Sequence, residues 1–185
     1  MKKHPRSLIR EAVKERLAAQ LPAIDPRLTA ARISIHRSTP IFAGKLPAIL
    51  IYTRDERIDE PPNADLGVRF RKLELSIEII ASGAEAAEEA DSLALAVEAI
   101  LDADETLGQM VQDTRLTRTE VDQDGDGDTP LLAVRLSYDV GYWTGPAQDD
   151  GVLPLQVLVS WVPETGADHE HSYRPLGNMH LENSP

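Results

Sequence analysis

The chain has 185 residues, of which 42% are hydrophobic, 27% charged and 4% aromatic, and its formal net charge is −12. This composition predicts a soluble globular protein with a largely aliphatic core, large enough for one domain plus appendages. The absence of cysteine excludes disulfides, thiolate metal sites and a cysteine nucleophile. The negative charge argues against general binding to nucleic-acid phosphates. No apolar run is long enough to cross a membrane or to form a secretory leader, so we expect a soluble protein made in the cytoplasm.

A helix and a short strand are predicted first. Four apolar residues recur at helical spacing over residues 7–21: Ile9, Val13, Leu17 and Leu21. Pro22 and Pro26 end this helix. Residues 32–37 alternate between apolar and polar side chains, which is typical of a strand.

Two longer strands are predicted next, with a loop between them. Residues 48–52 form a continuous apolar run, which favours a strand covered on both faces. Residues 55–67 are polar and contain two prolines, which predicts a long exposed loop that contacts a neighbouring subunit. Residues 68–81 alternate strictly, and four apolar side chains point to one face: Leu73, Leu75, Ile77 and Ile79.

A second helix and a hairpin follow. Residues 84–101 have apolar side chains at helical spacing with carboxylates opposite, and a short helical turn is expected near residues 104–110. Residues 114–121 form a polar edge strand, where Arg115 and Arg118 discourage unwanted pairing. A turn over residues 122–130 leads to a final strand over residues 131–142.

A boundary is expected at Gly145–Pro146. Residues 1–145 form the main domain, and residues 146–185 form a C-terminal extension with an alternating strand over 152–162 and a polar arm. The order of elements predicts an α+β fold with one mostly antiparallel sheet and two helices packed on one face.

One segment of the chain is strongly acidic. Between Lys72 and Arg115 there is no lysine or arginine but there are eleven carboxylates. One interpretation is a solvated helix face, and the alternative is an acidic surface that lines a channel or meets a basic partner.

Two metal sites are considered and not favoured. Residues 122–128 resemble the start of a calcium-binding EF-hand loop, but the twelfth position is Ala133 rather than glutamate, and the flanks read as strands. A Gly-rich hairpin turn explains this segment better. His169 and His171, with Asp168 and His180 nearby, lack an apolar shell, so a solvated tail is the better account. We therefore expect no metal and no cofactor.

No catalytic set can be assembled either. Ser7, Ser34 and Ser38 are near His4 and His36 in sequence, but none occupies a nucleophile elbow. There is no phosphate-binding or dinucleotide-binding glycine pattern. Trp143 and Trp161 are interpreted as packing or interface residues. The sequence therefore predicts a protein that is not an enzyme.

Several segments of the sequence resemble those of a known protein family. Residues 46–56 (LPAILIYTRDE) and 71–78 (RKLELSIE), together with 104–108, 111–116 and 136–142, resemble the tail-terminator or minor tail protein U-like proteins of long-tailed phages. The resemblance spans residues 7–144. These phrases concern fold and assembly rather than catalysis.

The resemblance implies a structural virion protein at the head-proximal end of the tail. Members of this family form a homo-oligomeric ring, a hexamer, on the last ring of the tail tube. They end tube polymerisation and provide the joint to the head connector or neck protein. DNA passes through the lumen without specific binding, and no membrane is involved. An acidic surface in the lumen would repel the DNA phosphates.

The extension after Gly145 lies outside this resemblance. Its alternating strand either pairs with a neighbour's sheet, as a clasp between subunits, or adds a strand to its own sheet. Two rival functions remain: another neck protein, such as a head-completion or connector subunit, and an enzyme or calcium-binding module.

Overall fold

The computed structural model describes residues 3–35, 41–59, 67–124, 131–145, 158–159, 168–169 and 174–175. The chain divides into two compact units, Met1–Pro146 and Ala147–Pro185. Within the described residues, no helix combines the length and the apolar character needed to cross a membrane.

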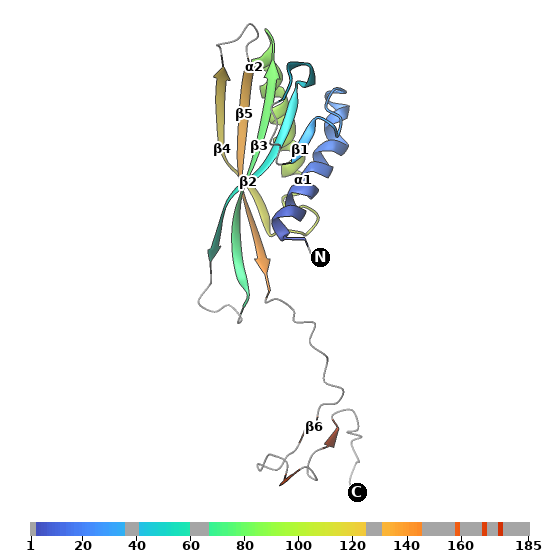
Figure 1. Ribbon diagram of the computed structural model, residues 1–185, viewed down its shortest axis with the longest axis vertical. Coiled ribbons are helices and arrows are strands. Elements are labelled where there is room, and N and C mark those ends of the chain that lie inside the picture. The colour runs from blue at the N-terminus through green and yellow to red at the C-terminus, as the bar shows by residue number, and fades with distance from the viewer. Residues whose placement is uncertain are drawn as a thin grey trace. The chain divides into compact units, whose positions relative to one another are not determined.

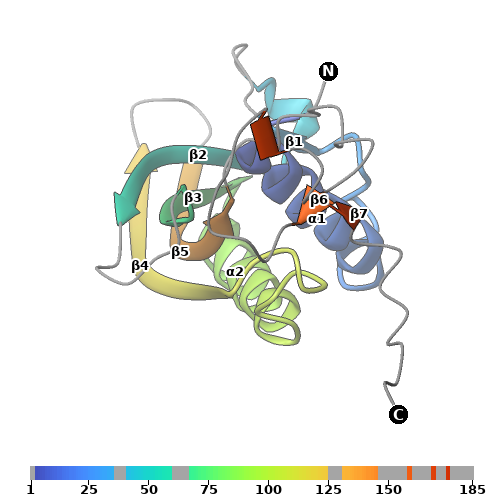
Figure 2. The same cartoon turned by 90° about the horizontal axis from the view of Figure 1, so that it is seen from below.

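The first unit is built on a five-stranded sheet with the order β1-β2-β3-β5-β4. Its strands are β1 (Ile33–Ile35), β2 (Ala48–Asp59), β3 (Arg69–Ser82), β4 (Asp113–Asp124) and β5 (Leu131–Thr144). β1 pairs with β2 in parallel, and the other pairings are antiparallel. Both helices, α1 (Pro5–Gln20) and α2 (Ala86–Asp102), lie on one side of the sheet (Figure 1, Figure 2). The predicted α+β fold is confirmed, and the sheet stays open.

The local sequence explains why α1 forms where it does. Pro5 occupies the first turn, where a missing backbone N–H costs nothing. The His4 side chain caps the helix, because its Nδ1 accepts a hydrogen bond from the Arg6 backbone N–H at 3.2 Å. The helix runs into a short 3-10 helix, η1 (Leu21–Ala23), that contains Pro22.

The hydrophobic core lies between the sheet and the two helices. The predicted apolar stripes of α1 and β3 are buried there. β5 contributes alternate residues as well, and the fully buried members of these three elements include Ile9, Leu17, Leu73, Leu75, Ile77, Ile79, Leu136, Tyr138 and Val140. The strict alternation of β3 therefore identified the buried face of the central strand correctly.

The predicted loop over residues 55–67 is wrong at its start. Residues 55–59 continue β2, and Arg57 pairs with Lys72 while Asp59 pairs with Phe70. The polar side chains suit a strand end that faces water, and pairing with the long β3 supplies the backbone hydrogen bonds. Residues 60–66 lie outside the described part of the chain.

The helical turn predicted near residues 104–110 is also wrong. This segment forms hydrogen-bonded turns, and Leu107, Gly108 and Gln109 all have positive φ angles (49°, 72° and 66°), which a right-handed helix cannot contain. Residues 122–124 of the turn predicted over 122–130 belong to β4 instead, and residues 125–130 are outside the described residues.

Two irregularities interrupt the outer long strands. In β2 the register shifts between Thr53 and Glu56, and in β4 it shifts between Leu116 and Arg118. Each shift is a β-bulge with one extra residue on the outer strand. Bulges increase the local twist and change which way side chains point. The edge strand β4, predicted as such, thus carries both a bulge and the arginines that discourage pairing.

In the second unit, β6 (Leu158–Val159) pairs antiparallel with β7 (Arg174–Pro175). Only this part of the strand predicted over residues 152–162 is described. Its partner is β7, and these two strands form a separate two-stranded sheet. Most of the predicted arm lies outside the described residues.

Candidate functional site

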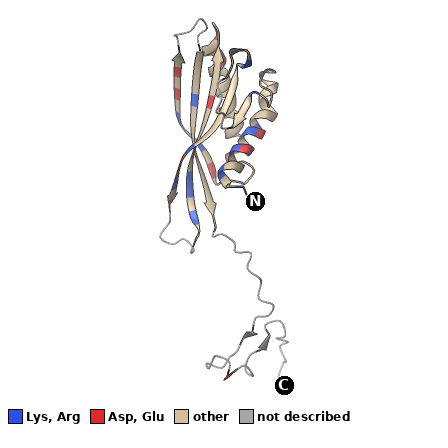
Figure 3. Cartoon of the chain, in the orientation of Figure 1, with Lys and Arg blue, Asp and Glu red and all other residues tan. Residues whose placement is uncertain are grey.

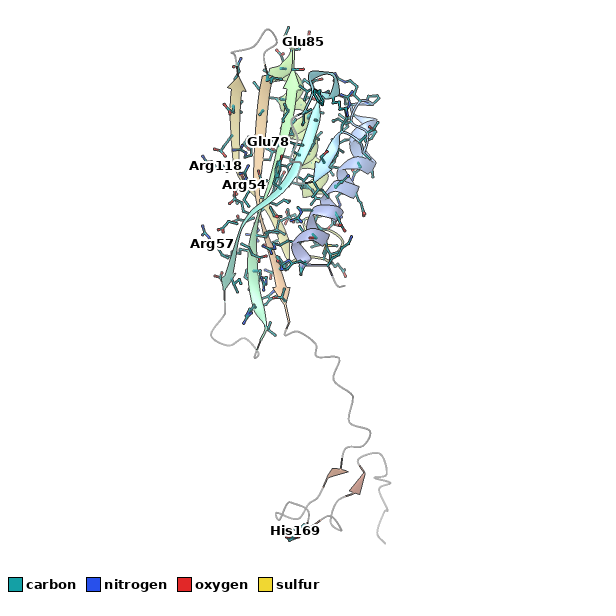
Figure 4. All side chains as sticks on the ribbon, viewed as in Figure 1. Arg54, Arg57, Glu78, Glu85, Arg118 and His169 are labelled. Carbon is teal, nitrogen blue, oxygen red and sulfur yellow. The ribbon has the colours of Figure 1, made fainter. Side chains whose placement is uncertain are left out.

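The face of the sheet opposite the helices carries several charged side chains. Register places Glu74, Ser76 and Glu78 of β3 on this open face, directly opposite Asp139, Ser137 and Arg135 of β5. Basic and acidic residues are interspersed along the strands (Figure 3). Arg54, Arg57 and Arg118 extend from the side of the sheet away from α1 (Figure 4).

A pocket of about 300 Å³ lies on this open face, and we call it the sheet pocket. Its lining comes from four strands, β2 to β5: Arg54, Glu74, Thr117, Arg118, Glu120, Arg135, Ser137 and Asp139. A neighbouring pocket of about 180 Å³ is lined by Asp55, Arg57, Lys72, Glu74 and Asp139. Glu74 and Asp139 therefore border both.

The two bulges shape the sheet pocket. In β2 the extra residue lies at Arg54–Asp55, opposite Glu74, and in β4 it is Thr117, beside Ser137. Thr117 Oγ1 donates a hydrogen bond to the Ser137 carbonyl oxygen at 3.0 Å. Because a bulge redirects side chains, both irregularities aim residues at the same pocket.

Most charges around the sheet pocket are neutralised within the chain. Arg135 pairs with Glu78 at 3.0 Å and lies 3.7 Å from Glu120, and Arg118 pairs with Glu120 at 2.7 Å. These residues form one small network across β3, β5 and β4. Because the side chains are partly exposed, its contribution to stability is small.

Glu74, Asp139 and Arg54 are the exceptions, because none of them makes an ion pair with the described residues. Glu74 and Asp139 face each other directly across β3 and β5. Cations flank this pair: Arg115 of β4 lies opposite Asp139 on its other side, and Arg57 and Lys72 line the neighbouring pocket.

A second unsatisfied group lies beside this pair. Ser76 follows Glu74 on the same face, its side chain is fully buried (0% exposed), and its hydroxyl has no hydrogen-bond partner among the described residues. Its cross-strand neighbour Tyr52 is covered by the Arg54 guanidinium, which lies 5.9 Å from the ring centroid. Buried polar groups are normally hydrogen-bonded, so Ser76 is an unsatisfied group within the sheet rather than part of the pocket lining.

The acidic segment between Lys72 and Arg115 does not form one surface. Glu88, Asp91 and Asp102 are exposed on the outer side of α2, whereas Glu74 and Glu78 lie on the open face of the sheet. Two other carboxylates are paired internally, Glu89 with Arg27 and Asp104 with Arg16. The solvated helix face thus accounts for part of the segment only.

The residues considered for catalysis have other contacts. His4 caps α1, and burial, followed by the charge of Arg6, lowers the pKa of its imidazole. The Ser7 hydroxyl accepts a hydrogen bond from Arg10 at 3.2 Å, and Ser34 is a half-buried residue of β1. His36 and Ser38 lie outside the described residues. The His4 imidazole therefore accepts hydrogen bonds from Arg6 and not from a serine hydroxyl among the described residues.

The residues considered for metal binding are only partly described. No group of three or more histidine or acidic side chains suited to a metal occurs in the described segments. Asp122 and Asp124 belong to β4, and the rest of the calcium-like segment is outside the description. Asp168 and His169 are described, but Glu170, His171 and His180 are not.

Trp143 packs within the first unit. The centroid of its ring lies 4.9 Å from that of the Phe70 ring, and its Nε1 donates a hydrogen bond to Gln112 Oε1 at 2.9 Å. The side chain is nevertheless half exposed. Trp161 lies outside the described residues.

Sequence reasoning did not find the sheet pocket. The alternation of β3 indicates that Glu74 and Glu78 share a face, but the pairing of Glu74 with Asp139 depends on the β3–β5 register. That register joins segments on either side of α2 and β4, and no local pattern specifies it.

Comparisons with known proteins give weak likenesses only. No family model matches the chain, and no curated protein matches it significantly. Among solved structures, the chain is similar to a chain from the virion of a native gene transfer agent particle, with 15% identity and a TM-score of 0.45, covering 71% of this chain and 93% of that one. A second solved chain is 19% identical with a TM-score of 0.43, covering 73% and 94%. Such distant similarities transfer no function.

Proposed function

We propose that this protein is a structural subunit of a phage-like virion that assembles into a ring at the head-proximal end of a tail. In this role it ends polymerisation of the tail tube and provides the joint to the head connector. The ring is a homo-oligomer, a hexamer, through which DNA passes without specific binding. It acts by contact with other proteins rather than by catalysis.

The sequence phrases that resemble tail-terminator proteins support the proposal. They span residues 7–144, which is nearly the whole of the compact unit Met1–Pro146. They lie in β2, β3, the turns after α2, the start of β4, and β5, and so include parts of four of the five strands of the sheet.

One observation carries the assembly function. In the sheet pocket Glu74 and Asp139 face each other, and neither makes an ion pair with the described residues. Such groups gain free energy when a partner supplies matching hydrogen bonds or charges. No set of acid, base and nucleophile among the described residues competes with that interpretation.

The acidic outer side of α2 has a place in this function. Within α2 there are five carboxylates and no lysine or arginine. If this side lines the lumen of the ring, it repels DNA phosphates and keeps the passage free. A reconstruction of the assembled ring with α2 on the outside would disprove this arrangement.

The C-terminal extension serves as a clasp in this proposal. The alternating residues 152–162 pair with a neighbouring subunit or with the connector. Deletion of residues 146–185 is expected to impair ring formation or head joining while the first unit stays folded. Normal assembly of the truncated chain would remove the clasp from the proposal.

Imaging of particles made without this protein tests the function as a whole. A tail terminator predicts filled heads beside detached tails of excessive length. Empty or leaking heads would instead identify a head-completion protein, and particles of normal shape would contradict both. Complementation with the wild-type chain is the control.

A further inference from the structure

We propose that two copies of this chain pair through the open edge of β4, antiparallel and about a two-fold axis at Thr119. The surface is residues 114–123, which we call the β4 edge. A two-fold contact closes after two copies, so it differs from the repeating contact of a ring. The inference therefore stands apart from the proposed function and concerns the free subunit.

The β4 edge is open and partly apolar. β4 is the last strand of the sheet, and among the described residues no strand pairs with its outer side (Figure 1). One row of its backbone N–H and C=O groups is therefore available to another strand. Leu116 and Val121 of this edge are 37% and 61% exposed, although both lie opposite buried core residues of β5. A second strand beside β4 would cover them.

The register with β5 shows which face of the sheet each side chain takes. Leu116, Thr119 and Val121 lie opposite buried residues of β5 and so point to the helix side. Arg118 and Glu120 line the sheet pocket and so point to the open face. Residues that oppose each other in an antiparallel pair share a face. A partner strand must therefore present its own side chains in a matching order.

A pairing centred on Thr119 brings unlike charges together. Thr119 then lies opposite Thr119 of the second copy, which is a favourable cross-strand pair. Arg118, with the extra residue of the bulge, lies opposite Glu120, and Arg115 lies opposite Asp122. The cations occupy the first half of the β4 edge and the anions the second half, and an antiparallel copy reverses this order. Each contact occurs twice because of the two-fold axis.

The same register matches the apolar side chains. Leu116 lies opposite Val121 of the second copy on the helix side, so that each covers the exposed surface of the other. Beyond the β4 edge, Asp113 faces Asp124 at each end. Arg115, which lies 3.0 Å from Asp113, offsets this repulsion.

The ion pairs within one chain do not prevent this contact. Arg118 lies 2.7 Å from Glu120 and Arg115 lies 3.0 Å from Asp113, but the two arginine side chains are 68% and 72% exposed. Such surface pairs are weak by themselves. A guanidinium group has five N–H donors, so each arginine can hold its own carboxylate and one from the second copy.

Other registers of the two strands are less favourable. A slip by two residues in one direction sets Glu120 opposite Glu120, and a slip in the other direction brings the two Arg118 side chains together. A slip by one residue sets helix-side residues opposite open-face residues. The arginines of the β4 edge thus discourage other pairings and permit the one centred on Thr119.

The first test traps the axis with a disulfide. The chain contains no cysteine, so Thr119→Cys in the full-length chain introduces the only thiol. Directly opposite residues of antiparallel strands have Cα atoms about 5 Å apart, which a disulfide spans. Mild oxidation is expected to convert most of the Thr119→Cys chains into covalent dimers, which non-reducing electrophoresis detects.

Val121→Cys is the matched control for this test. It lies on the same edge and the same face, but in the proposed register its two copies are four steps apart, or about 13 Å, which is too far for a disulfide. Similar yields of covalent dimer from both variants would indicate random collision and overturn the proposed axis.

The second test reverses charge at the outer pair. Asp122→Arg and Arg115→Asp are each expected to raise the dissociation constant of the dimer by about tenfold or more. A mixture of the two variants restores both opposite-charge pairs, so the mixed dimer should form within about threefold of the wild-type constant. Sedimentation equilibrium measures the three constants. Two variants that fail alone and also fail together would overturn the inference.

Controls separate this contact from folding and from net charge. Asp91→Arg on the outer side of α2 makes the same charge change as Asp122→Arg and should dimerise like wild type. Thermal unfolding verifies that each variant folds. Asp122 lies opposite Ala133 in β5, so Asp122→Arg decides the charge test by itself if Arg115→Asp does not fold.

The wild-type chain provides two further outcomes. A chain that stays monomeric up to about 1 mM would overturn the inference. A hexamer that is insensitive to Asp122→Arg, with no cross-link in Thr119→Cys, would support the proposed ring and overturn the β4 contact.

Discussion

Glu56 and Arg71 form an ion pair between β2 and β3, with 2.8 Å between Oε2 and Nη1, and their side chains are only 10% and 16% exposed. The bulge in β2 turns Glu56 to the helix side of the sheet. There its other carboxylate oxygen accepts a hydrogen bond from the Tyr142 hydroxyl, and Arg71 Nε donates to Thr144 at 3.0 Å. One carboxylate thus ties three strands together.

Replacing Glu56 should destabilise the first unit strongly. Glu56→Ala leaves the Arg71 guanidinium and the Tyr142 hydroxyl without their partner in a largely buried place, and we expect a loss of about 3 kcal/mol in the free energy of unfolding. Urea denaturation measures the loss. Asp55→Ala is the control, because its pair with Arg57 spans 3.5 Å between exposed side chains, and an equal loss there would contradict the interpretation.

The two buried tyrosines of β5 should respond differently to removal of the hydroxyl. Burial raises the pKa of both, and the hydrogen bond to Glu56 raises that of Tyr142 further. Tyr142→Phe removes a hydrogen bond and should cost about 1–2 kcal/mol. Tyr138→Phe removes a buried hydroxyl that has no partner among the described residues, so stability should be unchanged or higher. Thermal unfolding of the two variants compares them, and the opposite ranking would refute this assignment.

Asp104 should make stability depend on acid pH. Hydrogen bonds from the Thr106 hydroxyl, then the Arg16 guanidinium and the Gly108 amide, hold the pKa of its carboxyl well below the ordinary value of 3.8. Because the folded pKa is depressed, the stabilisation is complete well above the unfolded value and is lost as pH falls below it. Asp104→Asn should therefore lower the melting temperature at pH 7, and the gap to wild type should shrink from about pH 4 downwards.

Thermal scans of wild type and Asp104→Asn at several pH values test this dependence. A gap that stays constant between pH 7 and pH 2.5 would show that the carboxylate charge is irrelevant. Arg16→Gln is a useful companion, because it removes the cationic contact of Asp104 and should reproduce part of the loss.

Gly141 should not tolerate a side chain. A Cβ built there would lie 2.6 Å from Asp113 Oδ1 and 2.9 Å from Phe70 Cζ, and the Phe70 ring is held by its contact with Trp143. Gly141→Ala should cost about 1–2 kcal/mol. Gly145→Ala is the matched control, because nothing lies within 4 Å of its Cβ position. Equal stability of both variants by urea denaturation would argue against the steric explanation.

Local patterns were sufficient for most of the fold. The stripe from Ile9 to Leu21 predicted α1, and the alternation from Leu73 to Ile79 predicted the core face of β3, because hydrophobic period reports directly on which side is buried. The polar strand with Arg115 and Arg118 was correctly predicted as an edge. These features depend on neighbours a few residues away.

Features that depend on distant neighbours were not predictable. The polar residues 55–59 were predicted as a loop from their composition. They are part of a strand because they pair with β3, which their own sequence does not indicate. Nothing in the local sequence indicates that Leu107 and Gln109 adopt positive φ angles. The hydrogen-bonded turn around Asp104 accounts for these angles. The Glu74–Asp139 pair needs the register of two strands separated by α2 and β4. The candidate site therefore emerged only from the tertiary structure.

The bulge in β2 also limits how the length of this strand can change. Side chains alternate along a strand, so one extra residue exchanges the faces of all residues that follow it. Beyond Thr53 it places Glu56 on the helix side and Arg57 on the open face. Deleting a single codon at Arg54 or Asp55 would remove the extra residue and leave both assignments unchanged, because Glu56 would still pair with Leu73 and Arg57 with Lys72. A deletion elsewhere in the strand would exchange the faces of the residues on one side of it.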